Sequence, residues 1–151
     1  MAEERSFSML KPGVLQRRIV GEVLSRLEAK GFRIIGLKMM RVSRQLAETH
    51  YREHRDKAFF GELVDYICSA PLIALVLEAD GAVAMLRHLC GATKADQAAP
   101  GTIRHDFALE VGRNLTHASD SPENGEKEAA LWFKAEEMVA WKRAVDGWIF
   151  E

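Results

Sequence analysis

Along this chain, short apolar runs alternate with longer stretches in which apolar residues recur at helical spacing. Four runs are rich in β-forming residues and are predicted to be strands, over residues 6–10, 32–42, 72–77 and 115–118. Helical spacing predicts helices between and after them, over residues 19–30, 43–51, 59–67, 82–90 and 122–133. The uninterrupted apolar run at 72–77 predicts a strand buried on both faces.

The elements follow one another as β-α-β-(αα)-β-α-loop-β-α, and this order predicts an α+β fold. The arrangement that fits is ferredoxin-like βαββαβ, a four-stranded antiparallel sheet covered by helices, which we expect on one face. Helical periodicity is lost from 92 to 112, which predicts a long loop before the last strand, and such loops are usually functional or disordered. With no composition break or internal repeat, residues 1–151 are predicted to form a single domain.

Composition narrows the function classes. Lys and Arg total 21 and Asp and Glu total 22, so no global field draws the chain toward nucleic acid or an anionic membrane. The longest apolar run, 71–77, is far shorter than the roughly 20 residues that span a bilayer. The charged residues 1–5 lead into no apolar signal segment. Cys68 and Cys90 lack metal-type spacing and are expected to be reduced core residues, which favours a cytoplasmic protein.

Two short patterns look like chemistry when read locally. His50 to His54 matches H-x-x-E-H, a zinc pattern, but a third ligand is not evident and a solvated helix face is favoured. His54-Arg55-Asp56 is similar to the catalytic loop of protein kinases, but the accompanying asparagine and D-F-G are missing. No glycine-rich phosphate loop occurs, so a nucleotide would have to be held by side chains.

A third stretch, residues 113–121, places His117 between a short apolar step and the start of a helix at Pro122. An imidazole at such a junction can be oriented on one side and stay open to a ligand on the other. Taken alone, the stretch is better explained as a strand-end histidine beside a helix cap.

A set of separate motifs in a fixed order decides otherwise. They run from Lys11-Pro12 through His50-Tyr51, Phe59-Phe60 and Gly91-Ala92-Thr93 to three later blocks: 99–104 (APGTIR), 111–121 (VGRN and HASDS) and 126–133 (EKE and LWF). From about Arg5 to Glu151 this pattern closely resembles the nucleoside diphosphate kinase family. The 99–104 and 114–121 blocks together are highly specific.

The resemblance implies a ferredoxin-like enzyme that moves the γ-phosphate of a nucleoside triphosphate to a nucleoside diphosphate by a ping-pong reaction through a phosphohistidine. By resemblance His117 is the nucleophile, Glu128 the carboxylate that orients it, and Ser119 the support of Glu128. Tyr51 is expected near the histidine. Such chemistry needs a neutral imidazole with one free lone pair, the dominant form near pH 7 for a group of pKa about 6.5.

The resemblance also implies a nucleotide site. Lys11, Arg87, Thr93 and Arg104 match phosphate-binding positions, and Asn114 matches a ligand of the sugar hydroxyl. Phe59 and Val111 match the pair that sandwiches the base. Mg²⁺ is implied as the cofactor, held through the phosphates, so no dedicated metal ligand is expected. Family members are hexamers or tetramers, and the long loop with the C-terminal residues 148–151 favours a homo-oligomer of the hexameric type.

The chain departs from the family pattern at Lys11-Pro12-Gly13-Val14-Leu15, where the usual order is Lys-Pro-Asp-Gly-Val. Val14 is unsuitable if that position needs a positive φ, which puts the placement of Lys11 in question. This departure keeps open an alternative, a catalytically impaired member that acts as an oligomeric nucleotide-binding scaffold. A ferredoxin-like RNA-binding module is disfavoured, because its aromatic signature is absent and the net charge is near neutral.

Overall fold

The computed structural model describes residues 3–151. Its sheet has four strands in the order β2-β3-β1-β4, and every neighbouring pair is antiparallel. The strands are β1 (Glu4–Leu10), β2 (Arg33–Met40), β3 (Leu72–Ala79) and β4 (Thr116–Ala118). The predicted α+β ferredoxin-like class is confirmed. None of the helices in the described part of the chain is long and apolar enough to cross a membrane.

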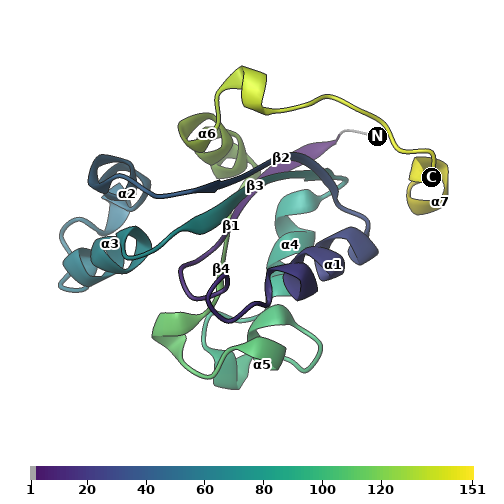
Figure 1. Ribbon diagram of the computed structural model, residues 1–151. Helices are drawn as coiled ribbons and strands as arrows, with labels where there is room; N and C mark the ends of the chain where they lie inside the picture. Colours follow the sequence, from purple (N-terminus) through teal and green to yellow (C-terminus); the bar gives the residue numbers. More distant parts are fainter. Residues whose placement is uncertain (1–2) are drawn as a thin grey trace.

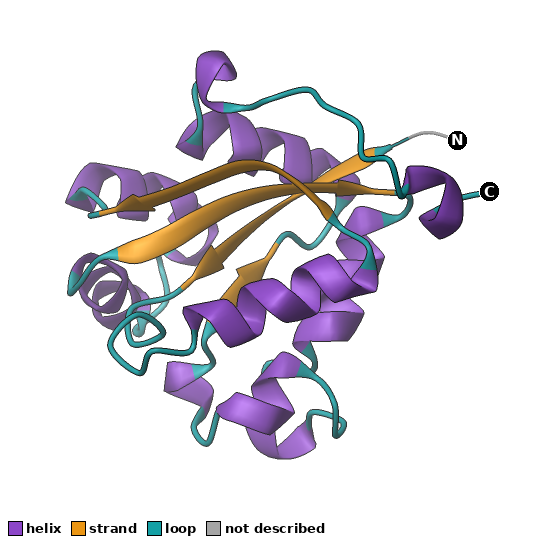
Figure 2. Ribbon diagram, turned by 45° about the vertical axis from the view of Figure 1, so that its right-hand side comes forward, coloured by secondary structure: helices purple, strands orange, loops and turns teal. Residues whose placement is uncertain are grey.

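Helices cover both faces of the sheet (Figures 1 and 2), so the expectation of helices on one face is wrong. One face packs against α1 (Val20–Lys30) and α4 (Ala82–Cys90), with Leu75 and Leu77 of β3 in the shared core. The other face packs against α2 (Arg44–His50), α3 (Phe60–Cys68) and α6 (Pro122–Trp132). Alternate residues of β1 and β3 enter the two cores, which is why β3 is apolar throughout, as predicted.

Local signals set several of the boundaries. Ser43 accepts a hydrogen bond from the Leu46 amide at the start of α2, and Ser121 accepts one from the Asn124 amide at the start of α6. Gly31 ends α1 in the left-handed conformation with a φ of 114°. These helix starts and this stop agree with the sequence prediction.

The segment predicted as a long loop contains more structure than its sequence pattern suggested. It holds the short helix α5 (Ile103–Phe107) and two 3₁₀ helices, Ala95–Gln97 and Val111–Arg113. Each of these pieces is too short for a helical period to register in the sequence. The chain ends with a further 3₁₀ helix, Ala135–Glu137, and α7 (Asp146–Ile149). Cys90 is a buried free thiol as expected, whereas Cys68 is only half-buried.

Candidate active site

His117 lies in the middle of β4, an edge strand of three residues that pairs with β1 opposite Met9. Leu115, directly before β4, has a φ of 73°, so the predicted strand start at Leu115 is shifted to Thr116. The backbone of β4 is fixed by β1, while the His117 side chain is 20% exposed and lines a cavity. The imidazole is therefore anchored and accessible at once.

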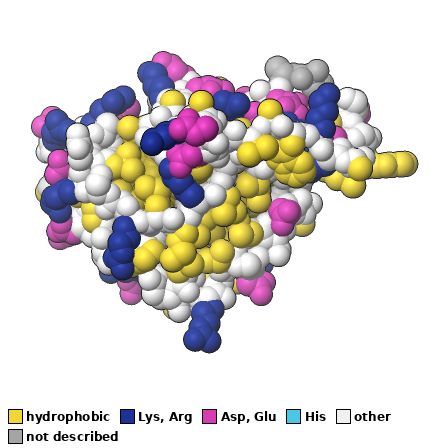
Figure 3. Space-filling view, turned by 45° about the horizontal axis from the view of Figure 1, so that its top comes forward, with side chains coloured by type: hydrophobic (Ala, Val, Ile, Leu, Met, Phe, Trp, Pro, Cys, Tyr) yellow, Lys and Arg dark blue, Asp and Glu magenta, His cyan; other side chains and the backbone are white. Residues whose placement is uncertain are grey.

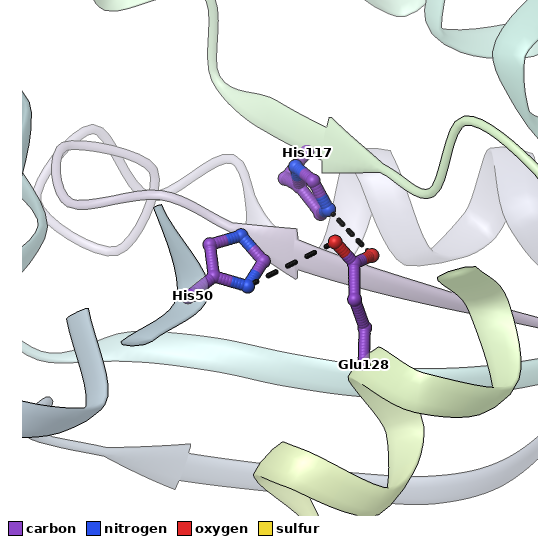
Figure 4. Close-up of side chains that lie close together, drawn as sticks. All are labelled: His50, His117 and Glu128. Atoms are coloured by element: carbon purple, nitrogen blue, oxygen red, sulfur yellow. Dashed lines mark hydrogen bonds and ion pairs between the residues drawn. The ribbon is translucent and has the colours of Figure 1, made fainter. Parts of the chain in front are cut away.

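A carboxylate, itself supported by a hydroxyl, fixes the orientation of this imidazole. His117 Nε2 lies 2.9 Å from Oε1 of Glu128 (Figure 4). Ser119 Oγ donates to the same oxygen at 2.6 Å. A neutral imidazole has one donor and one acceptor nitrogen, so a proton on Nε2 leaves the lone pair on Nδ1. Burial alone would raise the pKa of Glu128, but the hydrogen bonds from His117 and Ser119 outweigh it and hold that pKa below its ordinary value. The carboxylate stays ionised beside His117.

A close approach of α6 to β1 places Glu128. At Gly125, one turn before Glu128, an added Cβ atom would lie 2.3 Å from the backbone oxygen of Arg5. Only glycine permits the helix to pack against the strand at this distance. Ser119 Oγ also accepts from the Phe7 amide at 3.1 Å, which ties the support of Glu128 to β1.

His50 is a site residue that the sequence reasoning did not assign. Its side chain is 2% exposed, so the favoured interpretation of a solvated helix face is wrong. Trp132 Nε1 donates to His50 Nδ1 at 3.1 Å, and the His50 ring packs edge-on to the His117 ring at 4.7 Å. Burial, then the nearby His117, lowers the pKa of His50 to about 3. His54 follows the end of α2 in the 3₁₀ helix Arg52–His54, so the two histidines do not share a face of one helix.

Lys11 follows β1 directly and is 8% exposed, and its Nζ donates to Asn114 Oδ1 at 2.8 Å. The doubt raised by the shifted glycine is resolved here. Gly13 has a φ of 109°, whereas Val14 does not take a positive φ and is fully buried. Burial, then the charge of Arg104, lowers the pKa of Lys11 to about 8.

Arg104 is held by three backbone carbonyls. It donates to Gly91 O at 2.7 Å, Thr116 O at 2.6 Å and Asn114 O at 3.3 Å, and it is 8% exposed. It belongs to α5, which Thr102 caps by accepting from the His105 amide. Burial lowers the pKa of Arg104 from its ordinary value, although a guanidinium so far above neutral pH stays charged.

A cavity of about 760 Å³ brings most of the expected residues together. Those that line it are Lys11, Tyr51, Arg87, Thr93, Arg104, Asn114, His117 and Glu128. Three of the expected residues are not among its lining. Ser119 is fully buried behind Glu128, while Phe59 and Val111 are both 47% exposed.

Tyr51 is placed beside the histidines, as expected from the resemblance. Its ring packs edge-on to His50 at 4.7 Å. Its hydroxyl is buried and has no hydrogen-bond partner among residues 3–151. Burial raises the pKa of this hydroxyl, so it remains a neutral donor over the physiological range.

This arrangement combines an oriented nucleophile with buried cations. An anion that enters the cavity meets the buried Lys11 and Arg104 and the exposed Arg87, which line it together with His117. Cations in a buried setting are strongly attractive to phosphate, because little water screens them. The geometry suits phosphoryl transfer to and from a histidine.

Comparison with known proteins gives a consistent result. The family model described as "Nucleoside diphosphate kinase" matches residues 4–138. A nucleoside diphosphate kinase of Archaeoglobus fulgidus is 53% identical over 148 residues, 98% of each chain. One of Thermosynechococcus vestitus is 52% identical over 148 residues, 98% of this chain and 99% of the other. The structure of a nucleoside diphosphate kinase of Halobacterium salinarum in complex with CDP superposes with a TM-score of 0.96 at 45% identity, covering 99% of this chain and all of that one.

Proposed function

This chain belongs to the nucleoside diphosphate kinase family, and from that premise we propose how its own residues carry the phosphoryl group. It is a phosphotransferase that moves the γ-phosphate of a nucleoside triphosphate to a nucleoside diphosphate. The proposal assigns the nucleophile to Nδ1 of His117. The observation that carries it is the bond between His117 Nε2 and Glu128, which leaves the Nδ1 lone pair free in a cavity lined by buried cations.

The reaction has two balanced halves. The Nδ1 lone pair attacks the γ-phosphorus, an N–P bond forms, and the P–O bond to the leaving diphosphate breaks with its electron pair. The diphosphate departs, a second diphosphate enters, and its terminal oxygen attacks the same phosphorus. The N–P bond then breaks and the lone pair returns to Nδ1. Glu128 holds the Nε2 proton throughout and stabilises the positive charge that develops on the ring.

The buried cations supply the stabilisation that phosphoryl transfer depends on. The Arg104 guanidinium can donate to two phosphate oxygens at once, and Lys11 adds a point charge. Arg87 and Thr93 line the same cavity. The Lys11–Asn114 hydrogen bond places an amide that can bind a sugar hydroxyl next to the phosphate end. Tyr51 offers beside the histidines a buried hydroxyl that has no hydrogen-bond partner among residues 3–151.

A divalent cation accompanies the nucleotide phosphates in this family, and we propose Mg²⁺. Lys11, Arg87 and Arg104 make the phosphate end of the cavity cationic, so Mg²⁺ there would take its oxygen ligands from the phosphates and water. The ion would neutralise phosphate charge. The residues that receive the Mg²⁺-bound phosphates would be Arg87, Thr93 and Arg104.

Phe59 and Val111 are proposed to sandwich the base. Both are exposed apolar side chains, and stacking reads no base edge, which suits an enzyme that must accept every nucleoside.

We also propose a homo-oligomer, a hexamer rather than a tetramer. Large apolar side chains are exposed in the described part of the chain, among them Leu109 at 97% and Trp148 at 92%, and Figure 3 shows hydrophobic side chains gathered on one face. The cytoplasmic location stays a prediction.

The test is to incubate the protein with γ-labelled ATP and Mg²⁺ and then add an unlabelled nucleoside diphosphate. We expect one acid-labile, base-stable label that any nucleoside diphosphate discharges. His117→Ala should abolish the label, while His88→Ala, an exposed histidine of α4, should keep it. An unlabelled wild type that still binds nucleotide would instead support the scaffold alternative. Light scattering of the intact protein tests the hexamer.

A further inference from the structure

Three side chains of metal-binding type meet beside the nucleophile (Figure 4). One ligand atom from each of His50, His117 and Glu128 lies within 4.8 Å of the other two. We propose that they form a binding site for a divalent transition-metal ion of the Zn²⁺ class, and that an ion bound there blocks phosphorylation of His117. The site is separate from the Mg²⁺ that travels with the nucleotide.

The hydrogen bonds around Glu128 leave one of its oxygens facing His50. Both hydrogen bonds that the described residues make to this carboxylate end on Oε1, from His117 and Ser119. Oε2 faces His50 Nδ1 at 3.9 Å. An indole N–H only donates, so the Trp132 bond to Nδ1 means that Nδ1 carries a lone pair and not a proton. An oxygen and a nitrogen, both electron-pair donors, thus face each other across a short gap.

The spacing of these atoms is close to that of ligands on one ion. Two ligands on a tetrahedral Zn²⁺, with bonds of about 2.0–2.1 Å, lie about 3.4 Å apart. The 3.9 Å between Nδ1 and Oε2 and the 2.9 Å between His117 Nε2 and Oε1 lie on either side of that value. Small side-chain rotations would bring all three groups onto one ion. The change breaks two hydrogen bonds, the neutral one from Trp132 to His50 and the one from His117 Nε2–H to Glu128.

The ligand types select the ion. Two imidazoles and one carboxylate are a common zinc set in which a fourth position stays open to water. Mg²⁺ demands oxygen ligands and is not expected here. All three residues line the cavity, so an ion can enter from solvent. Charged side chains of both signs line that cavity. Five cationic residues weaken cation binding, Lys11, Arg52, Arg87, Arg104 and Lys127, whereas Glu53 and Asp120 favour it. We therefore expect weaker binding than at a closed structural zinc site.

The consequence for catalysis rests on the proposed function. A neutral imidazole that ligates a metal through Nε2 carries its proton on Nδ1. In the metal-bound form, the Nε2 proton of His117 therefore moves to Nδ1 by way of solvent, and Nδ1 loses the lone pair that attacks phosphorus. The ion takes the place of the Nε2–H bond to Glu128 and holds His117 in the tautomer whose Nδ1 is protonated. Binding of the ion and formation of phosphohistidine become mutually exclusive.

Metal binding is tested directly, without reference to activity. Nucleotide-free protein is titrated with Co²⁺, whose visible absorption reports nitrogen ligation, and the Co²⁺ is then displaced with Zn²⁺. The key variant is His50→Phe, which keeps an aromatic ring against His117 but removes the ligand atom. Glu128→Gln removes the carboxylate by an independent route. His54→Gln, in the same cavity but outside the cluster, is the matched control, and circular dichroism checks that each variant is folded.

We expect one Co²⁺ per chain, affinity at least about tenfold lower in His50→Phe and in Glu128→Gln, and no change in His54→Gln. Unchanged affinity in His50→Phe, or no nitrogen-ligated Co²⁺ in the wild type, overturns the proposed site. Labelling by ATP with excess Mg²⁺ is then followed as Zn²⁺ is added, with each variant compared to its own zinc-free rate. Zn²⁺ should suppress wild-type labelling, and the zinc concentration needed should rise in His50→Phe by the same factor as the loss of affinity.

The two proposals fail differently. A protein that binds Co²⁺ through His50 but takes no label from ATP even without zinc contradicts the proposed role of His117 and leaves the metal site standing. A protein that is labelled normally and shows no nitrogen-ligated Co²⁺ contradicts the metal site alone. Labelling that is unaffected by zinc at full occupancy contradicts the proposed block.

Discussion

The two parts of the proposed nucleotide site, the phosphate end and the base end, are built in opposite ways. At the phosphate end, Lys11 and Arg104 are each 8% exposed and are fixed by Asn114 and by backbone carbonyls. At the proposed base end, Phe59 and Val111 lie outside the cavity lining and are each 47% exposed. Charge is effective in transfer chemistry when it is preorganised and shielded from water, whereas stacking needs only an apolar surface. Changes at the phosphate end should therefore alter the rate of transfer, and changes at the base end should alter binding.

The largest effect is expected from Lys11→Met, which keeps the shape of the side chain and removes its charge. We expect kcat to fall by about 10²–10³-fold, the usual cost of losing one preorganised donor at a developing charge. Because burial already lowers the Lys11 pKa to about 8 from 10.5, the nucleotide-free variant should be more stable at pH 7, by up to about 3 kcal/mol. Single-turnover labelling and urea denaturation measure the two quantities.

The same pKa fixes how stability depends on pH. The folded Lys11 pKa lies below that of the unfolded chain, so the unfolded state binds more protons between about pH 8 and 10.5. The penalty from charged Lys11 is thus full below pH 8 and is relieved as the pH rises through that window. The stability gain of Lys11→Met over the wild type should shrink from pH 8 upward. Lys127→Met, at an exposed lysine of the same cavity, should show neither effect, and a loss of stability in Lys11→Met would contradict the burial argument.

Gly91→Ala should damage the phosphate end without touching a cavity residue. Gly91 has a φ of 87°, and an added Cβ would lie 2.5 Å from Thr102 Oγ1, the group that caps α5. Its carbonyl also accepts from Arg104. We expect a loss of about 1–3 kcal/mol in unfolding free energy and a lower kcat/KM, because strain at this position displaces Arg104. Gly61→Ala, in α3 with open space around it, should be neutral or slightly stabilising. Equal effects of the two changes would contradict the proposed strain at Gly91.

Phe59→Ala tests the base end. Loss of one stacking ring should raise KM about tenfold with kcat nearly unchanged, because the ring contributes equally to ground-state and transition-state binding. The increase should be similar for adenine, guanine and cytosine nucleotides. Stability should hardly change, as the ring is half-exposed. Met85→Ala, another partly exposed apolar residue, provides the comparison. A drop in kcat with constant KM would mean that the two ends are not separable.

The fold was more accessible to sequence reasoning than the walls of the site. Six consecutive apolar residues predicted the burial of strand β3, and Ser43 and Ser121 predicted two helix starts. These features could be predicted because each depends on neighbouring residues in the sequence. Which face each helix covers is not local, and the expectation of one covered face failed. Helix α5 escaped notice because five residues carry no period. Because α5 was not predicted, the capping role of Thr102 and the hydrogen bonds from Arg104 to backbone carbonyls were not predicted either.

The residues of the site likewise differ in how far the sequence predicts them. His117, Lys11 and the other expected residues were placed by the order of motifs along the chain, which a sequence displays. The environment of His50 was not, because its partner Trp132 lies 82 positions away and no spacing rule connects them. His50 and Trp132 meet because α2 and α6 pack on the same face of the sheet, and the sequence alone does not show this.

The smallest effect is expected from Asp106→Asn, which probes the exposed outer support of the phosphate end. Asp106 pairs with Arg26 of α1 and accepts from the Gly101 amide, and the Arg26 bond and then the Gly101 bond lower the Asp106 pKa. Because the folded pKa is depressed, this contribution is present above about pH 4 and is lost as the pH falls below it. An exposed pair is screened, so Tm should fall by less than about 3 °C at pH 7, with no difference in acid. Glu123→Gln, which breaks a comparable exposed pair in α6, is the control. An effect of Asp106→Asn on kcat as large as that of Lys11→Met would show that the rigidity of the phosphate end depends on its surface and not on its buried bonds.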